Sequence, residues 1–216
     1  PEFDGTEVVQ AIVSPKTGDI AATFCRGKER AIWADQTLTT TVCGIEFELV
    51  PNLFFQPNQF LLEQVMSSVV NLSNPVNLTM DLFCGSGFFS LPLAKLSSRV
   101  VGVDRRSTRI AIKNAQRNQV TNIEFIKASV SQFLAHSNLR PDLVILDPPR
   151  SGAGHNIVRK IAALSPEKIV YISCNPTTFA PEASLLIEKG YTLSSLKFID
   201  QFPHSHHIET IGLFQK

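Results

Sequence analysis

The sequence predicts an α/β protein with a doubly wound, mostly parallel sheet of seven strands and a short N-terminal antiparallel β extension. Two observations support this fold class. From residue 58 onward, short apolar runs alternate with segments whose apolar residues recur at helical spacing. Such alternation implies a parallel sheet with helices on both faces. Before residue 54, apolar and polar positions alternate over short stretches bounded by Gly and Pro, which indicates antiparallel strands.

The composition is that of a globular protein. Of the 216 residues, 44% are hydrophobic and 18% are charged, and the net charge is only +1. A nucleic-acid partner therefore requires a local basic patch. No apolar run approaches the ~20 residues of a membrane span, and the first residues lack the pattern of a secretory leader. We expect a cytoplasmic protein with no membrane partner, and a monomer.

Four stretches near the N-terminus alternate apolar and polar side chains and are predicted to be short strands. They read VVQAIV, IAATF, AIWA and TTTVCGIEFELV. From Asn58 the pattern changes to helical spacing. We therefore divide the chain into a β extension, residues 1–53, and a second domain, residues 54–216.

The second domain is predicted to begin with a helix of about three turns, because apolar residues between Phe60 and Val69 recur at helical spacing. The strands expected after it are 78–83, 100–104, 123–126, 143–147 and 169–173. The helices expected between these strands lie near 90–97, 107–118, 129–136, 155–163 and 177–189. Two further strands, 192–199 and 207–214, close the sheet, and one of them is expected to be antiparallel.

A glycine turn follows the first strand of this sheet, in the sequence MDLFCGSGFFSLPLA. Gly85 and Gly87 let the backbone approach a ligand, and the helix that opens after them offers unpaired N–H groups. The next strand ends in Asp104, where a carboxylate accepts hydrogen bonds from ribose hydroxyls. Because a GxG turn alone fits any tight strand–helix connection, the signal for a cofactor lies in the combination.

Two cofactor classes use this arrangement, dinucleotides and S-adenosylmethionine. A dinucleotide fingerprint requires a third glycine, whose place Ser90 takes here. The pattern D-x-F-x-G-x-G, beginning at Asp81, fits S-adenosylmethionine better. The fourth strand ends in LDPPR, and nucleic-acid base methyltransferases carry an Asp/Asn-Pro-Pro turn at that point. Its rigid prolines hold Asp147 beside the transferable methyl group, although Asp147 taken alone fits a simple turn cap.

The fifth strand ends in SCNPTT, which places Cys174 at the edge of the sheet where α/β enzymes do their chemistry. On this motif alone, the cysteine is either a space-filling small hydrophobe or a nucleophile. None of the four cysteines, at positions 25, 43, 84 and 174, lies in a CxxC pair. We therefore expect no bound metal and no metal cluster in this chain.

Five stretches together resemble the S-adenosylmethionine-dependent RNA uracil-5-methyltransferase family, which makes 5-methyluridine in ribosomal or transfer RNA. They are FFQPN (54–58), DLFCGSG (81–87), LDPPRSGA (146–153), YISCNPTT (171–178) and FPHSHHIE (202–209). The resemblance implies a Rossmann-like class I methyltransferase fold over residues 54–216. The preceding residues resemble the end of the family's central β region. Because the family's N-terminal RNA-binding β-barrel and the cysteine cluster of some members are missing, the chain resembles a catalytic-domain fragment or a truncated member.

The resemblance also implies a mechanism. Uracil C5 is a poor nucleophile until a thiolate adds to C6 and converts the ring to an enolate. Cys174 matches the family's nucleophile, and Glu209 matches the base that removes the C5 proton. Asp147 is expected to orient both the base and the cofactor. Whether His204, His206 or His207 assists the thiol stays open.

The other site residues follow from the same resemblance. The positions that match the cofactor site are Gln56, Phe83, Gly85, Gly87, Asp104, Ser129 and Asp147. Phe88 and the pair Arg105-Arg106 depart from the family's pattern beside this site. For RNA we expect contacts from Arg150 and Phe55, with Phe54 as a further aromatic candidate. Basic residues of the extension, Arg26, Lys28 and Arg30, are weaker candidates for phosphate contacts.

Three other functions fit parts of the sequence. An RNA cytosine-5-methyltransferase usually carries a second cysteine after the Pro of its fourth-strand motif, where this chain has Arg150. A base N-methyltransferase leaves SCNP unexplained. A non-catalytic RNA-binding domain with a methyltransferase fold leaves Cys174 and Glu209 unexplained. The favoured hypothesis is an S-adenosylmethionine-dependent RNA uracil-5-methyltransferase.

Overall fold

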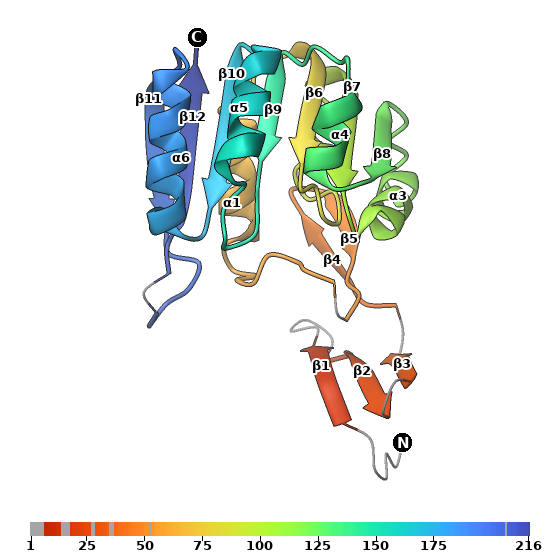
Figure 1. Cartoon of the computed structure of the whole chain (residues 1–216). Helices are drawn as coiled ribbons and strands as arrows, with labels where there is room; N and C mark the ends of the chain where they lie inside the picture. The colour runs from red at the N-terminus through yellow and green to blue at the C-terminus, as the bar shows by residue number, and fades with distance from the viewer. Residues whose placement is uncertain (1–6, 14–17, 27–28, 35–36, 52, 206) are drawn as a thin grey trace.

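The structure is a computed structural model that describes residues 7–13, 18–26, 29–34, 37–51, 53–205 and 207–216. Its main body is a seven-stranded sheet in the order β11-β12-β10-β9-β6-β7-β8 (Figure 1). The strands are β6 (Val76–Leu82), β7 (Ser97–Asp104), β8 (Ile123–Lys127), β9 (Leu143–Leu146), β10 (Lys168–Ser173), β11 (Thr192–Ile199) and β12 (Glu209–Gln215). β12 runs antiparallel to both of its neighbours, and the remaining pairs are parallel. The predicted fold class is confirmed.

Helices cover both faces of this sheet. They are α1 (Leu62–Val70), α2 (Ser90–Leu93), α3 (Thr108–Arg117), α4 (Val130–His136), α5 (His155–Leu164) and α6 (Pro176–Glu188). Apolar side chains of α4, α5 and α6 form one buried cluster with the sheet, and those of α1 and α2 form another. The longer helix expected over 90–97 is wrong, because Ser97 already pairs with Val76 in the β6–β7 ladder. None of the described helices has the length and apolar character needed to cross a bilayer.

The N-terminal residues form antiparallel strands, as expected. β1 (Glu7–Val13), β2 (Ile20–Arg26) and β3 (Glu29–Ala34) make one small sheet, and β4 (Thr39–Val42) and β5 (Ile45–Glu48) make a hairpin. Cys43 and Gly44 connect the hairpin strands, with φ of 49° and 75°. Positive φ at both central residues is what a type I′ turn requires, and its twist matches that of the strands.

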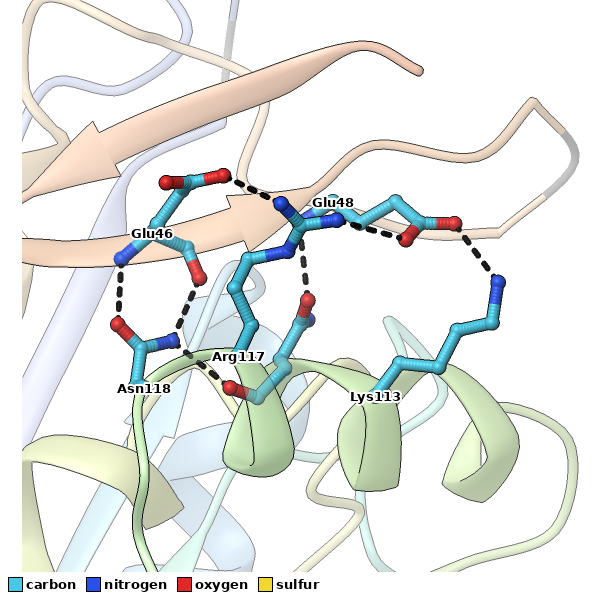
Figure 2. A network of polar contacts seen from close by, with 6 residues as sticks. Glu46, Glu48, Lys113, Arg117 and Asn118 are labelled. Atoms are coloured by element: carbon cyan, nitrogen blue, oxygen red, sulfur yellow. Dashed lines mark hydrogen bonds and ion pairs between the residues drawn. The ribbon is translucent and has the colours of Figure 1, made fainter.

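The β4–β5 hairpin packs on the main body through an apolar and a polar contact. Phe47 is fully buried, and its ring centroid lies 5.6 Å from those of both Phe55 and Phe88. On the polar side, β5 lies along α3 (Figure 2). Glu46 N donates to Asn118 Oδ1 at 2.9 Å, and Asn118 Nδ2 donates back to the Glu46 carbonyl at 2.7 Å. The hairpin therefore shares a core with the sheet, while the predicted division after residue 53 stays a prediction.

Ion pairs flank the same contact between the hairpin strand β5 and helix α3, which we call the seam. Arg117 reaches Glu46 at 2.7 Å and Glu48 at 3.4 Å, and Lys113 reaches Glu48 at 3.1 Å (Figure 2). Glu48 N also donates to Asn114 Oδ1 at 2.9 Å. The chain that leaves this hairpin, residues 49–58, contains the FFQPN motif. The seam thus fixes the point from which that motif enters the main body.

Asn118→Ala should destabilise the protein more than Lys113→Ala. The first change leaves a hairpin N–H and a carbonyl without their partner, which costs about 1–3 kcal/mol. The second removes one side of an exposed ion pair, which is worth less than about 1 kcal/mol. Urea denaturation of the two variants gives both free energies of unfolding. Equal losses would show that the amide does not hold the hairpin in place.

Candidate active site

A cavity of about 860 Å³ opens at the carboxyl ends of β6, β7, β9 and β10. β6 and β9 are neighbours at the point where the chain switches direction across the sheet, and ligands of doubly wound sheets bind at this switch point. Nearly all of the predicted site residues line the cavity: Phe55, Gln56, Phe83, Gly85, Asp104, Ser129, Asp147, Arg150, Cys174 and Glu209. The structure thus brings together residues that lie up to 154 positions apart, from Phe55 to Glu209.

Gly87 is absent from that lining. Its backbone has φ of +83°, and a Cβ there would lie 2.5 Å from Leu91 Cδ1 and 3.3 Å from Phe125 Cζ. The structure therefore places Gly87 where the turn packs against its own helix and against β8. Gly85 differs, because it lines the cavity and a Cβ built on it would meet no atom within 4 Å. At Gly85 it is the positive φ of +54° that favours glycine.

Asp104 ends β7 with its carboxylate fixed by backbone donors. Its Oδ1 accepts from Arg106 N at 2.6 Å and from Ser107 N at 2.8 Å, and Oδ2 accepts from Gly85 N at 3.3 Å. Each carboxylate oxygen has two acceptor positions, so Oδ2 retains capacity for a further donor. A ligand hydroxyl in the cavity is a suitable donor for it. Ser129, on the next loop, caps α4 by accepting from Gln132 N at 3.2 Å.

Three carboxyl groups lie in or beside the cavity, of which Asp81 and Glu209 are buried and Asp147 is partly buried. Burial raises the pKa of Asp81 to about 7, although Ser90 donates a hydrogen bond to one of its oxygens. Burial also raises the pKa of Glu209 to about 7. The pKa of Asp147 is raised well above its usual range by burial and then by the charges of Glu209 and Asp81. Removal from water disfavours the ionised form of each carboxyl group, and a cationic ligand in the cavity would stabilise that ionised form.

Side-chain amides connect two of these carboxyls. Gln56 Nε2 donates to Asp147 Oδ2 at 3.3 Å. Gln201 Nε2 donates to Gln56 Oε1 at 3.3 Å and to Glu209 Oε2 at 2.8 Å. Sequence reasoning missed Gln201, since a buried amide in a loop produces no periodic pattern. The hydrogen bond from Gln201 lowers the pKa of Glu209 and so opposes part of the effect of burial.

The SCNPTT segment holds the Cys174 thiol between two loops. Asn175 caps α6 by accepting from Thr177 N at 3.2 Å, and it donates through Nδ2 to the Arg150 carbonyl at 3.0 Å. Pro176 occupies the first turn of the helix, where no N–H is needed. Cys174 precedes this cap, is half-buried and lines the cavity. The segment therefore fixes the thiol relative to the DPPR turn.

Opposing charges act on the Cys174 thiol. Its pKa is raised by burial and by the negative charge of Glu209, whereas the hydrogen bond and charge of Arg150 lower it. The Arg150 guanidinium also lies 5.8 Å from the centroid of the Phe202 ring. Arg150 is therefore a cation that favours the thiolate, and none of the described histidines is among the causes of this pKa shift.

The three candidate histidines have different surroundings. His204 is exposed, and its backbone is left-handed with φ of 62°. The ring of His207 packs edge-on against Phe202, with centroids 5.7 Å apart. His206 lies outside the described residues. These contacts do not decide between assistance to the thiol and the alternative of exposed loop histidines.

The two phenylalanines of FFQPN, Phe54 and Phe55, have different surroundings in the structure. The Phe55 ring packs against Phe47 and Phe88, with centroids 5.6 and 5.5 Å apart, and this cluster explains the unusual Phe88. Phe54 lines the cavity as well but is 66% exposed. Phe54 is thus the freer aromatic ring at the mouth of the cavity. The side chains of Arg26, Lys28 and Arg30 lie outside the described part of the chain.

Glu182 is a second residue that sequence reasoning missed. Its carboxylate is buried and accepts from Tyr171 Oη at 2.6 Å, from Ala153 N at 3.1 Å and from Gly154 N at 2.9 Å. It therefore ties the loop after the DPPR turn to α6 and β10. The sequence did contain a signal for Glu182. This glutamate falls on the same face of the helix as Phe179, where the pattern calls for an apolar residue, and a charged residue at such a position indicates a buried partner.

The family model for tRNA (uracil-5-)-methyltransferase matches residues 29–216. Among curated proteins, the 23S rRNA (uracil(1939)-C(5))-methyltransferase of Legionella pneumophila is 42% identical over 180 residues, covering 80% of this chain and 40% of that protein. An uncharacterised RNA methyltransferase of Caldanaerobacter subterraneus is 36% identical over 199 residues, covering 90% of this chain and 44% of that protein. The chain thus spans less than half the length of these two relatives.

Solved structures agree with this result. A Pyrococcus abyssi tRNA (uracil-54, C5)-methyltransferase in complex with S-adenosyl-L-homocysteine matches with a TM-score of 0.81 and 25% identity, covering 94% of this chain and 58% of that chain. Trm5b of the same organism matches with a TM-score of 0.68 at 16% identity, covering 90% of this chain and 62% of that chain, which shows a shared fold alone. The expected Rossmann-like methyltransferase fold is confirmed.

The opposing charges around Cys174 give a prediction for thiol alkylation. In Arg150→Met the pH midpoint of Cys174 alkylation should rise, because a group that lowers the pKa is lost. In Glu209→Gln it should fall, because a negative charge that raises the pKa is lost. Iodoacetamide labelling read by peptide mass spectrometry measures both, with exposed Cys43 as the internal reference. Shifts of the same sign in the two variants would contradict this electrostatic assignment.

Proposed function

This chain belongs to the tRNA (uracil-5-)-methyltransferase family, and we propose that it transfers a methyl group from S-adenosylmethionine to C5 of a uridine in RNA. One observation carries the proposal. A thiol, a buried carboxyl with its pKa raised to about 7 and the carboxylate that ends β7 line one cavity. These are the nucleophile, base and ribose acceptor that the reaction requires. The Legionella pneumophila relative is named for 23S rRNA and the Pyrococcus abyssi uracil-54 methyltransferase for tRNA, so we propose RNA of one of these classes as substrate.

The cavity suits S-adenosylmethionine. Asp104 offers acceptor capacity to ribose hydroxyls, and Gly85 leaves open space beside the turn after β6. The carboxyls of buried Asp81 and partly buried Asp147, whose pKa values are raised, favour a ligand that carries positive charge, as this sulfonium does. Gln56, Phe83 and Ser129 complete the proposed contacts. When bound, the cofactor supplies an electrophilic methyl group.

Cys174 starts the proposed reaction. Its thiolate adds to C6 of the uracil, a C6–S bond forms, and the electrons of the C5=C6 bond move into an enolate through C4 and O4. C5 is then nucleophilic and would bond to the methyl group of the cofactor, while the electrons of the broken S–CH3 bond stay on sulfur and S-adenosylhomocysteine leaves. Arg150 favours the thiolate form of Cys174. Since a stacked base hides C5 and C6, the uridine has to be splayed out or single-stranded.

Glu209 completes the reaction. Its carboxylate takes the proton from C5, and the electrons of that C–H bond restore the C5=C6 double bond. The C6–S bond breaks, and its electrons return to the sulfur of Cys174. The proton left on Glu209 passes to solvent, which balances the one proton that the methylation releases. A pKa of about 7 allows Glu209 to accept and release this proton near neutral pH.

RNA contacts belong to the rim of the cavity in this proposal. Arg150 lies beside the thiol and the Phe202 ring, where it can approach a phosphate or a base. Phe54, being exposed, is available for stacking, and Phe55 can contribute an edge while it packs on Phe47. A monomeric state and a cytoplasmic location stay predictions.

Asp104→Ala should weaken binding of S-adenosylhomocysteine about ten- to a hundredfold, because a charge-assisted hydrogen bond is worth about 1.5–3 kcal/mol. Asp104→Asn, which keeps an acceptor oxygen for the backbone donors, should lose less. Isothermal titration calorimetry of wild type and both variants measures the affinities. Unchanged affinity in Asp104→Ala would remove Asp104 from the ribose site.

Glu209→Gln should trap the reaction after methyl transfer. Glutamine keeps the size of the side chain but cannot hold the C5 proton, so the methylated base stays bonded to Cys174. With labelled cofactor and RNA that lacks 5-methyluridine, we expect a denaturation-resistant RNA–protein band that contains the label. Wild type should instead release 5-methyluridine, which nucleoside analysis detects.

Controls separate the roles of the two residues. The double variant Cys174→Ala/Glu209→Gln should give no band, and Cys174→Ser should give no product because its hydroxyl stays protonated. An unlabelled band would mean that Glu209 acts before methyl transfer. If neither wild type nor Glu209→Gln transfers label to RNA, the proposed function is wrong for this chain.

A further inference from the structure

Gln201 lies behind the proposed base. It follows β11 by two residues and is only 3% exposed, and it does not belong to the lining of the cavity. Its amide nitrogen donates to Glu209 Oε2 at 2.8 Å and to Gln56 Oε1 at 3.3 Å. Glu209 is equally buried but does line the cavity. Gln201 therefore contacts the base from the protein side.

The two partners of Gln201 fix the orientation of its amide. A carboxylate oxygen accepts hydrogen bonds and does not donate, and Gln56 turns its own nitrogen toward Asp147, so its oxygen faces Gln201. Both partners therefore require the nitrogen of Gln201. The oxygen of Gln201 is buried without a partner in the described part of the chain. The amide oxygen of Gln201 is thus left unsatisfied, which costs free energy, while its amide nitrogen stays bonded to Glu209.

We propose that Gln201 is a positioning residue for Glu209: its N–H group holds Oε2 and so makes Oε1 the oxygen that takes the C5 proton. An amide N–H cannot accept a proton, so the oxygen that it occupies is the poorer site for protonation. The same bond stabilises the charged form of the base against burial. This inference rests on the proposed function, because it assigns a role within that reaction.

The sign of the expected effect follows from the bond. The hydrogen bond from Gln201 lowers the pKa of Glu209, so removing the donor raises that pKa. A base acts only in its deprotonated form, so the acid limb of the reaction should move to higher pH. Replacing Gln201 by Met changes no charge, so a shift reports the lost donor. Among the described residues, Asp147, Arg150 and Cys174 line the cavity together with Glu209. Ile199 of β11 pairs with Glu209, and Lys197, Asp200 and His207 are the titratable residues that lie within two positions of this pair in the sequence.

The test compares Gln201→Met with Tyr191→Phe. The control removes a buried hydrogen bond, from Tyr191 Oη to the Pro166 carbonyl at 2.9 Å, at the opposite end of the strands. The first measurement is the pH titration of the Glu209 carboxyl carbon by NMR with carbon-13-labelled glutamate, assigned by its loss in Glu209→Gln. Gln201→Met should raise the midpoint by about one to two pH units, as expected for a hydrogen bond to a charged group. Tyr191→Phe should leave it unchanged.

A midpoint in Gln201→Met that coincides with wild type would overturn the proposal. If Gln201→Met does not fold, the same titration of the Glu209 carboxyl in Gln201→Ala tests the proposal. It should shift the midpoint in the same direction but by less, because water can enter and donate. An unshifted midpoint in Gln201→Ala would equally count against the role.

A second measurement follows the reaction and separates this inference from the proposed function. With RNA and labelled cofactor, Gln201→Met should accumulate the methylated adduct at low pH and release it at high pH, whereas Tyr191→Phe should behave as wild type. A wild-type protein that makes no 5-methyluridine refutes the proposed function, and the NMR titration then still decides whether Gln201 sets the proton affinity of Glu209. A wild type that is active, with identical pH profiles in all three proteins, refutes the role of Gln201 alone.

Discussion

Burial of carboxyl groups at the edge of a parallel sheet is the constraint on which this site depends. The topology gathers Asp81, Asp147 and Glu209 at this edge, where burial raises the pKa of each, and a buried charge is costly unless donors or a counter-charge compensate it. Each carboxyl group accepts a hydrogen bond from a neutral side chain: Asp81 from Ser90, Asp147 from Gln56 and Glu209 from Gln201. Neutral donors offset only part of the cost. The site therefore retains carboxyls whose proton affinity is high enough for chemistry near neutral pH.

Hydrogen bonds also connect the loops at this edge of the sheet to one another. Asn175 connects the cap of α6 to the DPPR turn, and Glu182 holds the backbone just beyond that turn. A Cβ on Gly152 would lie 2.5 Å from the Glu182 carboxylate, so only glycine leaves room for it. These bonds fix the backbone that presents Cys174 and Arg150. Catalysis that depends on a thiol and a base at defined separation requires such support from residues that touch no substrate.

The sequence predicted what depends on local pattern. The strands and helices of the main sheet and the antiparallel extension follow from periodicity. Gly85, Asp104, Asp147 and Cys174 follow from turns and strand ends, whereas the other positions that line the cavity came from the resemblance to the family. Gln201 and the seam between Asn118 and the hairpin could not be predicted, because their partners lie far away in sequence. The predicted length of α2 was wrong for the same reason, because Ser97, expected in the helix, pairs with Val76 of β6 instead. Gly87 was expected to let the backbone approach a ligand, but packing of the turn against Leu91 explains a glycine there without a ligand.

Charge balance connects the cofactor to the choice of base in the proposed reaction. Methyl transfer would consume two charges together, the positive charge of the sulfonium and the negative charge of the enolate, in a cavity whose low dielectric magnifies any uncompensated charge. Glu209 keeps its negative charge until it takes the C5 proton, and the elimination then returns a negative charge to the sulfur of Cys174. The last step therefore moves negative charge from Glu209 to the thiol, which Arg150 favours as thiolate. A base with a pKa far below 7 would take that proton poorly, so the burial that raises the pKa of Glu209 serves this step.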